Sequence, residues 1–92
     1  MTATATVEIK NKKGLHARAA AKFVKVVAGG RAQVTVTKVG EDATVQGSSI
    51  LGLMMLGAEA GSQLNITAEG EGAQAVLQAL KELIEGKFGE QE

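Results

Sequence analysis

The sequence predicts a two-layer α+β domain in which helices cover one face of an antiparallel sheet. Three observations lead to this fold class. Four segments alternate apolar and polar residues, as strands with one buried face do. Three other segments repeat their apolar residues at the helical period. In chain order these segments read β-α-β-β-α-β-α, with no internal repeat or linker, so the 92 residues are expected to form one domain.

The first strand and the first helix are separated by a glycine-containing loop. A strand is predicted over residues 6–10, because Val7 and Ile9 alternate with charged residues there. From His16 onward the period changes to that of a helix, which ends at Gly29-Gly30. The apolar face of this helix comprises Ala20, Phe23, Val24 and Val27.

The middle of the chain predicts a hairpin followed by a short helix. Residues 31–38 and 43–46 alternate as strands and are joined by a short turn at Gly40-Glu41-Asp42. The apolar run 50–56 then predicts a helix that Gly57 closes.

The C-terminal third predicts one more strand and one more helix. The strand covers residues 63–69, and Gly86 ends the helix that follows. Phe88 is expected to fold back onto the core, and residues 89–92 are expected to form a frayed tail. The apolar stripe of the last helix comprises Ala73, Val76, Leu77, Leu80 and Ile84.

The composition excludes several classes of function. Without cysteine there is no disulfide framework, and one histidine cannot make a histidine-rich metal site, so we expect neither metal nor cofactor. No apolar run reaches the roughly 18–20 residues of a membrane-spanning helix, and residues 1–5 do not resemble a signal peptide. A cytoplasmic protein is therefore expected. Phe23 and Phe88 are the only aromatic residues, which argues against nucleic-acid binding.

The charges are distributed unevenly along the chain. Residues 1–38 contain eight Lys or Arg and one acid, whereas residues 39–92 contain two Lys and nine acids. The net charges of the two parts are therefore +7 and −7. This basic region around the histidine is interpreted either as ordinary solvated surface or as a docking face for an acidic or phosphorylated partner.

The single histidine lies where the first helix begins, and it is the only side chain with an ordinary titration near neutral pH. If His16 is the N-cap, the backbone N–H groups of Ala17, Arg18 and Ala19 point at whatever the imidazole carries. Arg18 adds a guanidinium suited to phosphate oxygens. This arrangement predicts an anion site around a nucleophilic nitrogen that can accept a phosphoryl group.

The competing interpretation is a surface histidine that happens to precede a helix. The sequence near His16 supplies no second catalytic acid or base. A self-sufficient enzyme is therefore not expected, whichever interpretation holds.

The segment Gly14-Leu15-His16-Ala17-Arg18-Ala19-Ala20 resembles the active-site signature G-L-H-A-R-P-A of the HPr family, the histidine phosphocarriers of the sugar phosphotransferase system. A second segment, 48–53, resembles the family's regulatory-serine helix start, and the likeness extends from Val7 to about Phe88. Ala19 departs from the usual proline, as in variants of HPr and of its nitrogen-branch relative NPr. The resemblance implies an open-faced β-sandwich with sheet order 1-4-2-3 and three helices on one side.

The resemblance also implies the roles of individual residues. His16 is expected to carry the phosphoryl group on Nδ1, with Arg18 and the amides of Ala17 and Arg18 binding its oxygens. Phospho-enzyme I is the expected donor and IIA domains are the expected acceptors of a monomeric carrier that has no turnover alone. Ser49 matches the serine modified by HPr kinase/phosphorylase where that enzyme exists, although a helix N-cap alone would also explain a serine there.

Partner docking is expected at the short helix and at the basic stripe of the first helix. A short helix has only one face for the core, and Leu53 and Leu56 suit that face. The other apolar residues of the helix would then be exposed as a docking patch. The alternative is that a loop or the tail covers them. The docking residues are therefore predicted to be Lys22, Lys25, Ile50, Leu51, Met54 and Met55.

Two alternative functions remain from the sequence. The first is the nitrogen-branch carrier, which has the same chemistry and a regulatory output. The second is a protein-interaction module that binds partners and carries no phosphoryl group.

Overall fold

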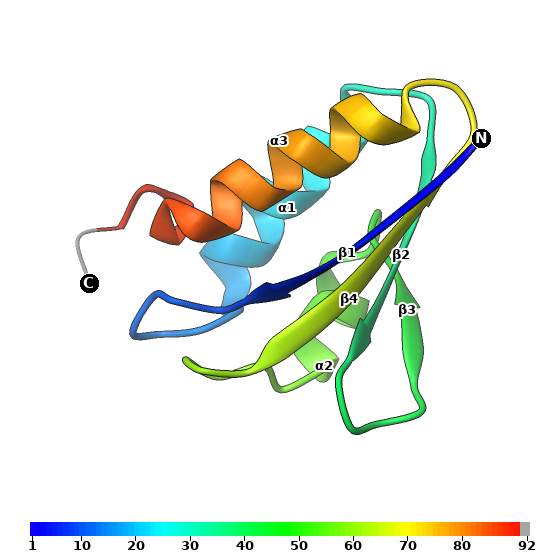
Figure 1. The fold of residues 1–92 in the computed structure, drawn as a ribbon. Helices are drawn as coiled ribbons and strands as arrows, with labels where there is room; N and C mark the ends of the chain where they lie inside the picture. The colour runs from blue at the N-terminus through cyan, green and yellow to red at the C-terminus, as the bar shows by residue number, and fades with distance from the viewer. Residues whose placement is uncertain (91–92) are drawn as a thin grey trace.

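The computed structural model describes residues 1–90 and contains the predicted order of elements (Figure 1). The strands are β1 (Thr2–Glu8), β2 (Gln33–Lys38), β3 (Thr44–Gln46) and β4 (Gln63–Glu69). The helices are α1 (Ala17–Ala28), α2 (Ile50–Met55) and α3 (Ala73–Glu85), followed by the 3-10 turn η1 (Lys87–Gly89).

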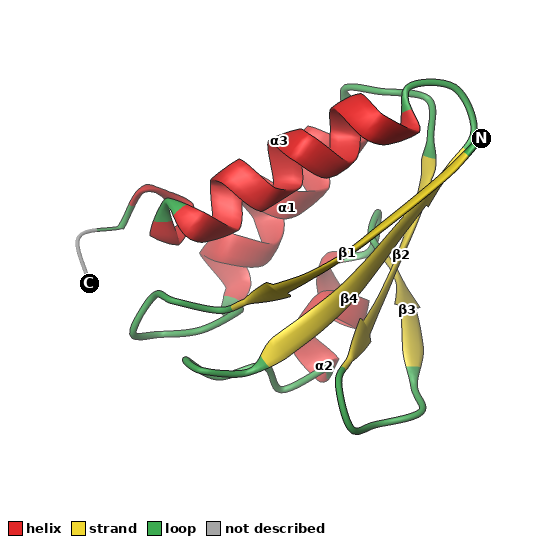
Figure 2. Cartoon of the chain, viewed as in Figure 1, coloured by secondary structure: helices red, strands yellow, loops and turns green. Residues whose placement is uncertain are grey.

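The four strands form one sheet in the order β1-β4-β2-β3, and all neighbouring strands are antiparallel. In β4, Leu64 lies opposite Val7 of β1 and Ile66 lies opposite Val36 of β2, so the last strand in the sequence occupies a central position in the sheet. Helices α1 and α3 lie across one face of the sheet, and α2 contacts α1 and β3. No helix among residues 1–90 covers the opposite face (Figure 2). The predicted fold class and the sheet order implied by the family resemblance are both confirmed.

The first strand begins earlier than predicted, at Thr2, and ends at Glu8. The residues added at its start alternate threonine with alanine, and alanine gives a weak apolar signal. In the structure Ala3 is buried, and it lies opposite Ala68 of β4. Pairing along the full length of β4 therefore extends the strand beyond the segment in which larger apolar residues alternate.

The hydrophobic core lies between the sheet and the helices. Each buried aliphatic or aromatic side chain contributes roughly 1.5–3 kcal/mol to folding relative to an exposed one. Val24, predicted on the buried face of α1, is only partly buried. The large side chains that are completely buried include Phe23, Leu53, Leu64, Ile66, Leu80, Ile84 and Phe88.

Two glycines allow close approaches that shape the region around α1. Gly14 has φ +69°, and a Cβ at this position would lie 2.4 Å from the carbonyl oxygen of Ala58. The next residue, Leu15, donates its N–H to that same oxygen at 2.9 Å. A Cβ on Gly47 would lie 2.8 Å from Val34 Cγ1. The Gly14 contact ties the start of α1 to the segment between α2 and β4.

The chain folds back onto the core after α3, as predicted for Phe88, which is completely buried. Lys87 and Phe88 both have left-handed backbone angles, with φ of 59° and 56°. The prediction of a frayed tail is wrong for Gly89 and Glu90, because Gly89 belongs to η1 and the side chain of Glu90 is hydrogen-bonded to two residues. The remainder of that predicted tail, 91–92, lies outside the described residues.

We expect Gly14→Ala to lower the free energy of unfolding by about 2–3 kcal/mol, because it combines a left-handed backbone with a backbone collision. Gly57→Ala is a matched control, since Gly57 has φ +66° and no atom within 4 Å of the added Cβ. The control should lose only about 1 kcal/mol. Urea denaturation of both variants measures the difference, and equal losses would show that the Ala58 contact is unimportant.

Candidate functional site

His16 is the N-cap of α1 and is positioned by the backbone on either side of it. Its backbone is extended, with φ −83° and ψ −178°, and its carbonyl oxygen accepts the N–H of Ala20 at 2.8 Å. Its Nδ1 accepts the N–H of Arg18 at 3.3 Å. The imidazole nitrogen thus takes the place that a serine or aspartate oxygen usually has at a helix start. Leu15, which directly precedes His16, is buried and anchors the chain before the helix.

The hydrogen bond from Arg18 defines the tautomer of His16. A nitrogen that accepts an N–H has no proton of its own, so Nδ1 carries a lone pair directed toward the first turn of α1. The side chain is 27% exposed, and the ring is therefore accessible without leaving the helix start. The predicted placement of His16 at the helix N-terminus is confirmed.

The other ring nitrogen of His16 faces a carboxylate. Nε2–H donates to Glu90 Oε2 at 2.5 Å, and Glu90 Oε1 accepts from Asn11 Nδ2 at 3.0 Å. Asn11 is completely buried and also donates to the carbonyl oxygen of Gly14 at 2.8 Å. The hydrogen bond from His16 is the main cause that lowers the pKa of the Glu90 carboxyl below its ordinary value of 4.5. The hydrogen bond from Asn11 and the charges of His16 and Lys13 also lower this pKa, whereas desolvation raises it.

The sequence analysis missed Glu90 because it assigned this residue to the tail. The contact joins residues 74 positions apart, and no local pattern reports such a pair. The one available signal was Phe88, an apolar residue two positions earlier that was expected to bring the chain back to the core.

The basic residues of α1 have different surroundings. Arg18 is exposed, and no ion pair with any residue in 1–90 holds its guanidinium. Lys22 is partly buried, and its Nζ donates to the carbonyl oxygen of Phe88 at 2.5 Å.

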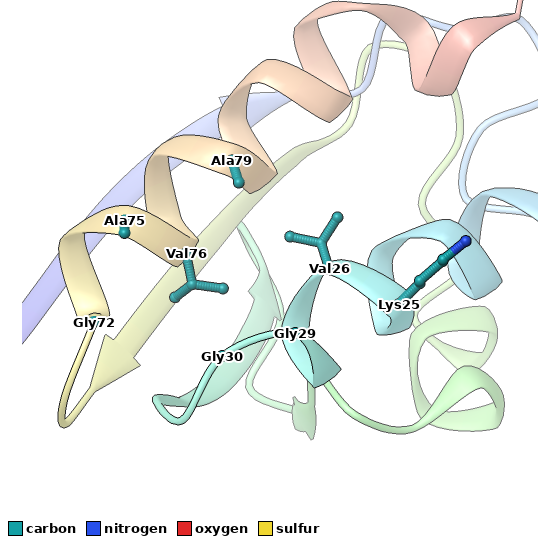
Figure 3. Close-up of a pocket in the computed structure, with 8 residues that line it drawn as sticks. All are labelled: Lys25, Val26, Gly29, Gly30, Gly72, Ala75, Val76 and Ala79. Atoms are coloured by element: carbon teal, nitrogen blue, oxygen red, sulfur yellow. The ribbon is translucent and has the colours of Figure 1, made fainter.

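Lys25 is exposed and borders a groove of about 320 Å³ between the end of α1 and the start of α3 (Figure 3). The groove is lined mainly by small and apolar residues, among them Val26, Val76 and Ala79.

Ser49 is the N-cap of α2, and its Oγ accepts the N–H of Gly52 at 2.9 Å. In the helix that follows, Leu53 is buried, as predicted. The predicted exposure of the remaining large side chains is also found, and the exposed fractions are 42% for Ile50, 68% for Leu51, 42% for Met54 and 75% for Met55. We call these four residues the α2 patch.

Within residues 1–90 no three histidine, cysteine, aspartate or glutamate side chains are grouped to hold a metal ion. None of the helices in this part of the chain is long and apolar enough to cross a membrane.

The arrangement at His16 suits the transient attachment of an anionic group. Nδ1 is an unprotonated nucleophile, the first-turn N–H groups have no acceptor within the helix, and the helix dipole places partial positive charge there. A phosphoryl group on Nδ1 would meet donors that already point at it.

Comparisons with known proteins agree with this geometry. Residues 3–86 match the PTS-HPr family model, described as the PTS HPr component phosphorylation site. The chain is 46% identical to the phosphocarrier protein HPr of Pseudomonas aeruginosa over 86 residues, 94% of either protein. It resembles the crystal structure of HPr from Thermoanaerobacter tengcongensis with a TM-score of 0.90 and 42% identity, over 98% of this chain and 99% of that one. A second structure from that organism, described as an HPr dimer, matches with a TM-score of 0.75 and 44% identity over 94% and 97% of the two chains. The chain therefore belongs to the PTS-HPr family of phosphocarrier proteins.

Proposed function

We propose that the chain carries a phosphoryl group on Nδ1 of His16, receiving it from phospho-enzyme I and passing it to IIA domains. The observation that carries this proposal is the hydrogen bond from Arg18 N–H to Nδ1, because it shows that Nδ1 is unprotonated and that its lone pair lies at the positive end of α1. We propose that the carrier acts in the cytoplasm as a monomer, needs no metal, and turns over nothing alone.

The transfer step needs no proton movement. The Arg18 N–H releases Nδ1, and the freed Nδ1 lone pair forms a bond to phosphorus while the bond from phosphorus to the donor breaks, so that electron pair leaves with the donor. The proton on Nε2 stays in place, so the ring becomes positive beside the negative phosphoryl oxygens. The amides of Ala17 and Arg18 and the Arg18 guanidinium stabilise those oxygens through position and charge. The reverse sequence delivers the group to the acceptor.

The docking surface in this proposal combines apolar and basic residues. The α2 patch is exposed, and its two methionines can adapt to a donor and to different acceptors. Helix α2 contacts α1, so the patch lies on the element next to the helix whose N-cap is His16. Lys25 supplies exposed positive charge, and Lys22 adds charge close to the Phe88 carbonyl that it binds.

Ser49 is the proposed site of regulation by an HPr kinase/phosphorylase, in cells that have one. Its position at the N-terminus of α2 suits an added phosphate, which would place negative charge beside the docking surface. That charge would weaken docking of an acidic donor.

We expect His16→Ala to abolish acid-labile labelling when the protein is incubated with enzyme I and labelled phosphoenolpyruvate, because the acceptor nitrogen is gone. Arg18→Ala should still be labelled, at a rate lower by about 10- to 100-fold. Circular dichroism checks that each variant folds. Persistent label on His16→Ala would place the phosphoryl group elsewhere.

We expect Leu51→Glu to weaken binding to enzyme I by about tenfold, because it puts a charge into the centre of an apolar contact. Val39→Glu is the matched control, since Val39 is 45% exposed and lies outside the α2 patch, after β2. Isothermal titration calorimetry measures both affinities. If the two variants bind equally well, the α2 patch is not the docking surface.

We expect Ser49→Asp to weaken binding to enzyme I by about fivefold, because it adds a negative charge and keeps a side-chain acceptor for the Gly52 N–H. Ser49→Asn also caps the helix and adds no charge, so it should bind like the wild type. Thermal unfolding of both variants checks the cap. Unchanged affinity of Ser49→Asp would contradict regulation by charge at this position.

A further inference from the structure

The sulfur atoms of this protein are few, and most of them lie on the proposed docking surface. The chain contains three methionines and no cysteine, tryptophan or tyrosine. Met54 and Met55 belong to the α2 patch, whereas Met1 precedes β1. A mild oxidant such as a peroxide reacts most readily with cysteine and methionine sulfur. In this chain such an oxidant therefore acts on the methionine thioethers, two of which are in the α2 patch.

The two methionines of the α2 patch are open to solvent to different degrees. The exposed fraction is 75% for the side chain of Met55 and 42% for that of Met54. No polar side chain occurs from Ile50 to Met55, so the surface around these sulfur atoms is apolar. Because oxidation of a side chain follows its exposure, a small peroxide should reach Met55 first and Met54 more slowly.

Each of these methionines lies beside an apolar residue of the same patch. Met54 is four positions after Ile50, and Met55 is four positions after Leu51. Side chains with this spacing are neighbours on the surface of a helix. A polar group created on either sulfur would therefore lie inside the apolar surface that a docked partner has to cover.

We propose that Met55 and Met54 form a reversible oxidation site through which hydrogen peroxide weakens docking to enzyme I. This inference rests on the proposed function, because it requires the α2 patch to be the docking surface. A sulfur lone pair attacks one oxygen of the peroxide, and the O–O bond breaks. The other oxygen leaves as water with the proton of the first, so the thioether is oxidised to a sulfoxide while the peroxide is reduced. A methionine sulfoxide reductase with a dithiol reverses the change and releases water and a disulfide.

A sulfoxide weakens an apolar contact for two reasons. Its oxygen is a hydrogen-bond acceptor, and burying it against a partner surface that offers no donor has a desolvation cost. Oxidation also removes the flexible apolar side chain with which methionine adapts to different surfaces. The reacting nitrogen belongs to His16 at the start of α1, outside the oxidised helix. We therefore expect oxidation to act on docking and to leave the chemical step intact.

The experiment compares each protein before and after treatment with hydrogen peroxide, with the peroxide removed before binding is measured. Peptide mass spectrometry measures the sulfoxide at each methionine, and isothermal titration calorimetry measures the affinity for untreated enzyme I. We expect Met55 to be oxidised before Met54. The oxidised wild type should bind about tenfold more weakly than its untreated form. Methionine sulfoxide reductases of both stereospecificities should restore the affinity.

Met54→Leu/Met55→Leu is the matched variant, because leucine is apolar, has a similar volume and cannot form a sulfoxide. Peroxide should change the affinity of this variant by less than about twofold relative to its own untreated form. Met1 is retained in the variant, is 85% exposed and lies outside the α2 patch, so its oxidation serves as an internal control. Circular dichroism checks that every treated and untreated protein is folded.

The outcomes separate this inference from the function on which it rests. Equal affinity of the oxidised and untreated wild type would overturn the inference, and so would patch methionines that stay reduced while Met1 is oxidised. An equal loss of affinity in the double variant would also overturn it. At saturating enzyme I the oxidised wild type should still be labelled on His16, and loss of that label would contradict an effect on docking. If the proposed function fails, the untreated wild type shows neither binding to enzyme I nor label on His16.

Discussion

The hydrogen bond between Arg18 N–H and His16 Nδ1 links the fold to the chemistry. Nδ1 of His16 caps α1, and the same nitrogen carries the lone pair that the proposed function uses. In that role the phosphoryl oxygens would take over as acceptors for the first-turn N–H groups, so the start of the helix keeps an acceptor in both states. In that role the site would require little rearrangement between the free and the loaded carrier.

The loop before His16 is held from two directions. On one side, the closeness of Gly14 and Leu15 to Ala58 joins the loop to the segment before β4. On the other side, the hydrogen bond between Asn11 and Glu90 joins it to the turn formed by residues 87–90. A site at the tip of a loop is usually mobile, and these contacts from distant parts of the chain explain how it can be precise.

Features that depend on residues close in the sequence could be predicted from it, whereas features that depend on distant partners could not. The helix start at His16, a serine cap before α2 and the exposure of Leu51 and Met55 depend on residues close in sequence, and local periodicity and capping rules predicted them. The early start of β1 and the role of Glu90 depend on partners more than 60 positions away. Alanines in a strand and an acid in a terminal segment carry no local signal of such partners.

The sheet order has a consequence for how the chain acquires its structure. The central strand, Gln63–Glu69, pairs with both β1 and β2, so neither of those strands can pair with its central neighbour until this late segment is available. During synthesis, the first 60 residues leave the ribosome with only the β2–β3 hairpin and helices to form. Completion of the sheet then coincides with emergence of the last third of the chain, which makes folding a late and cooperative event.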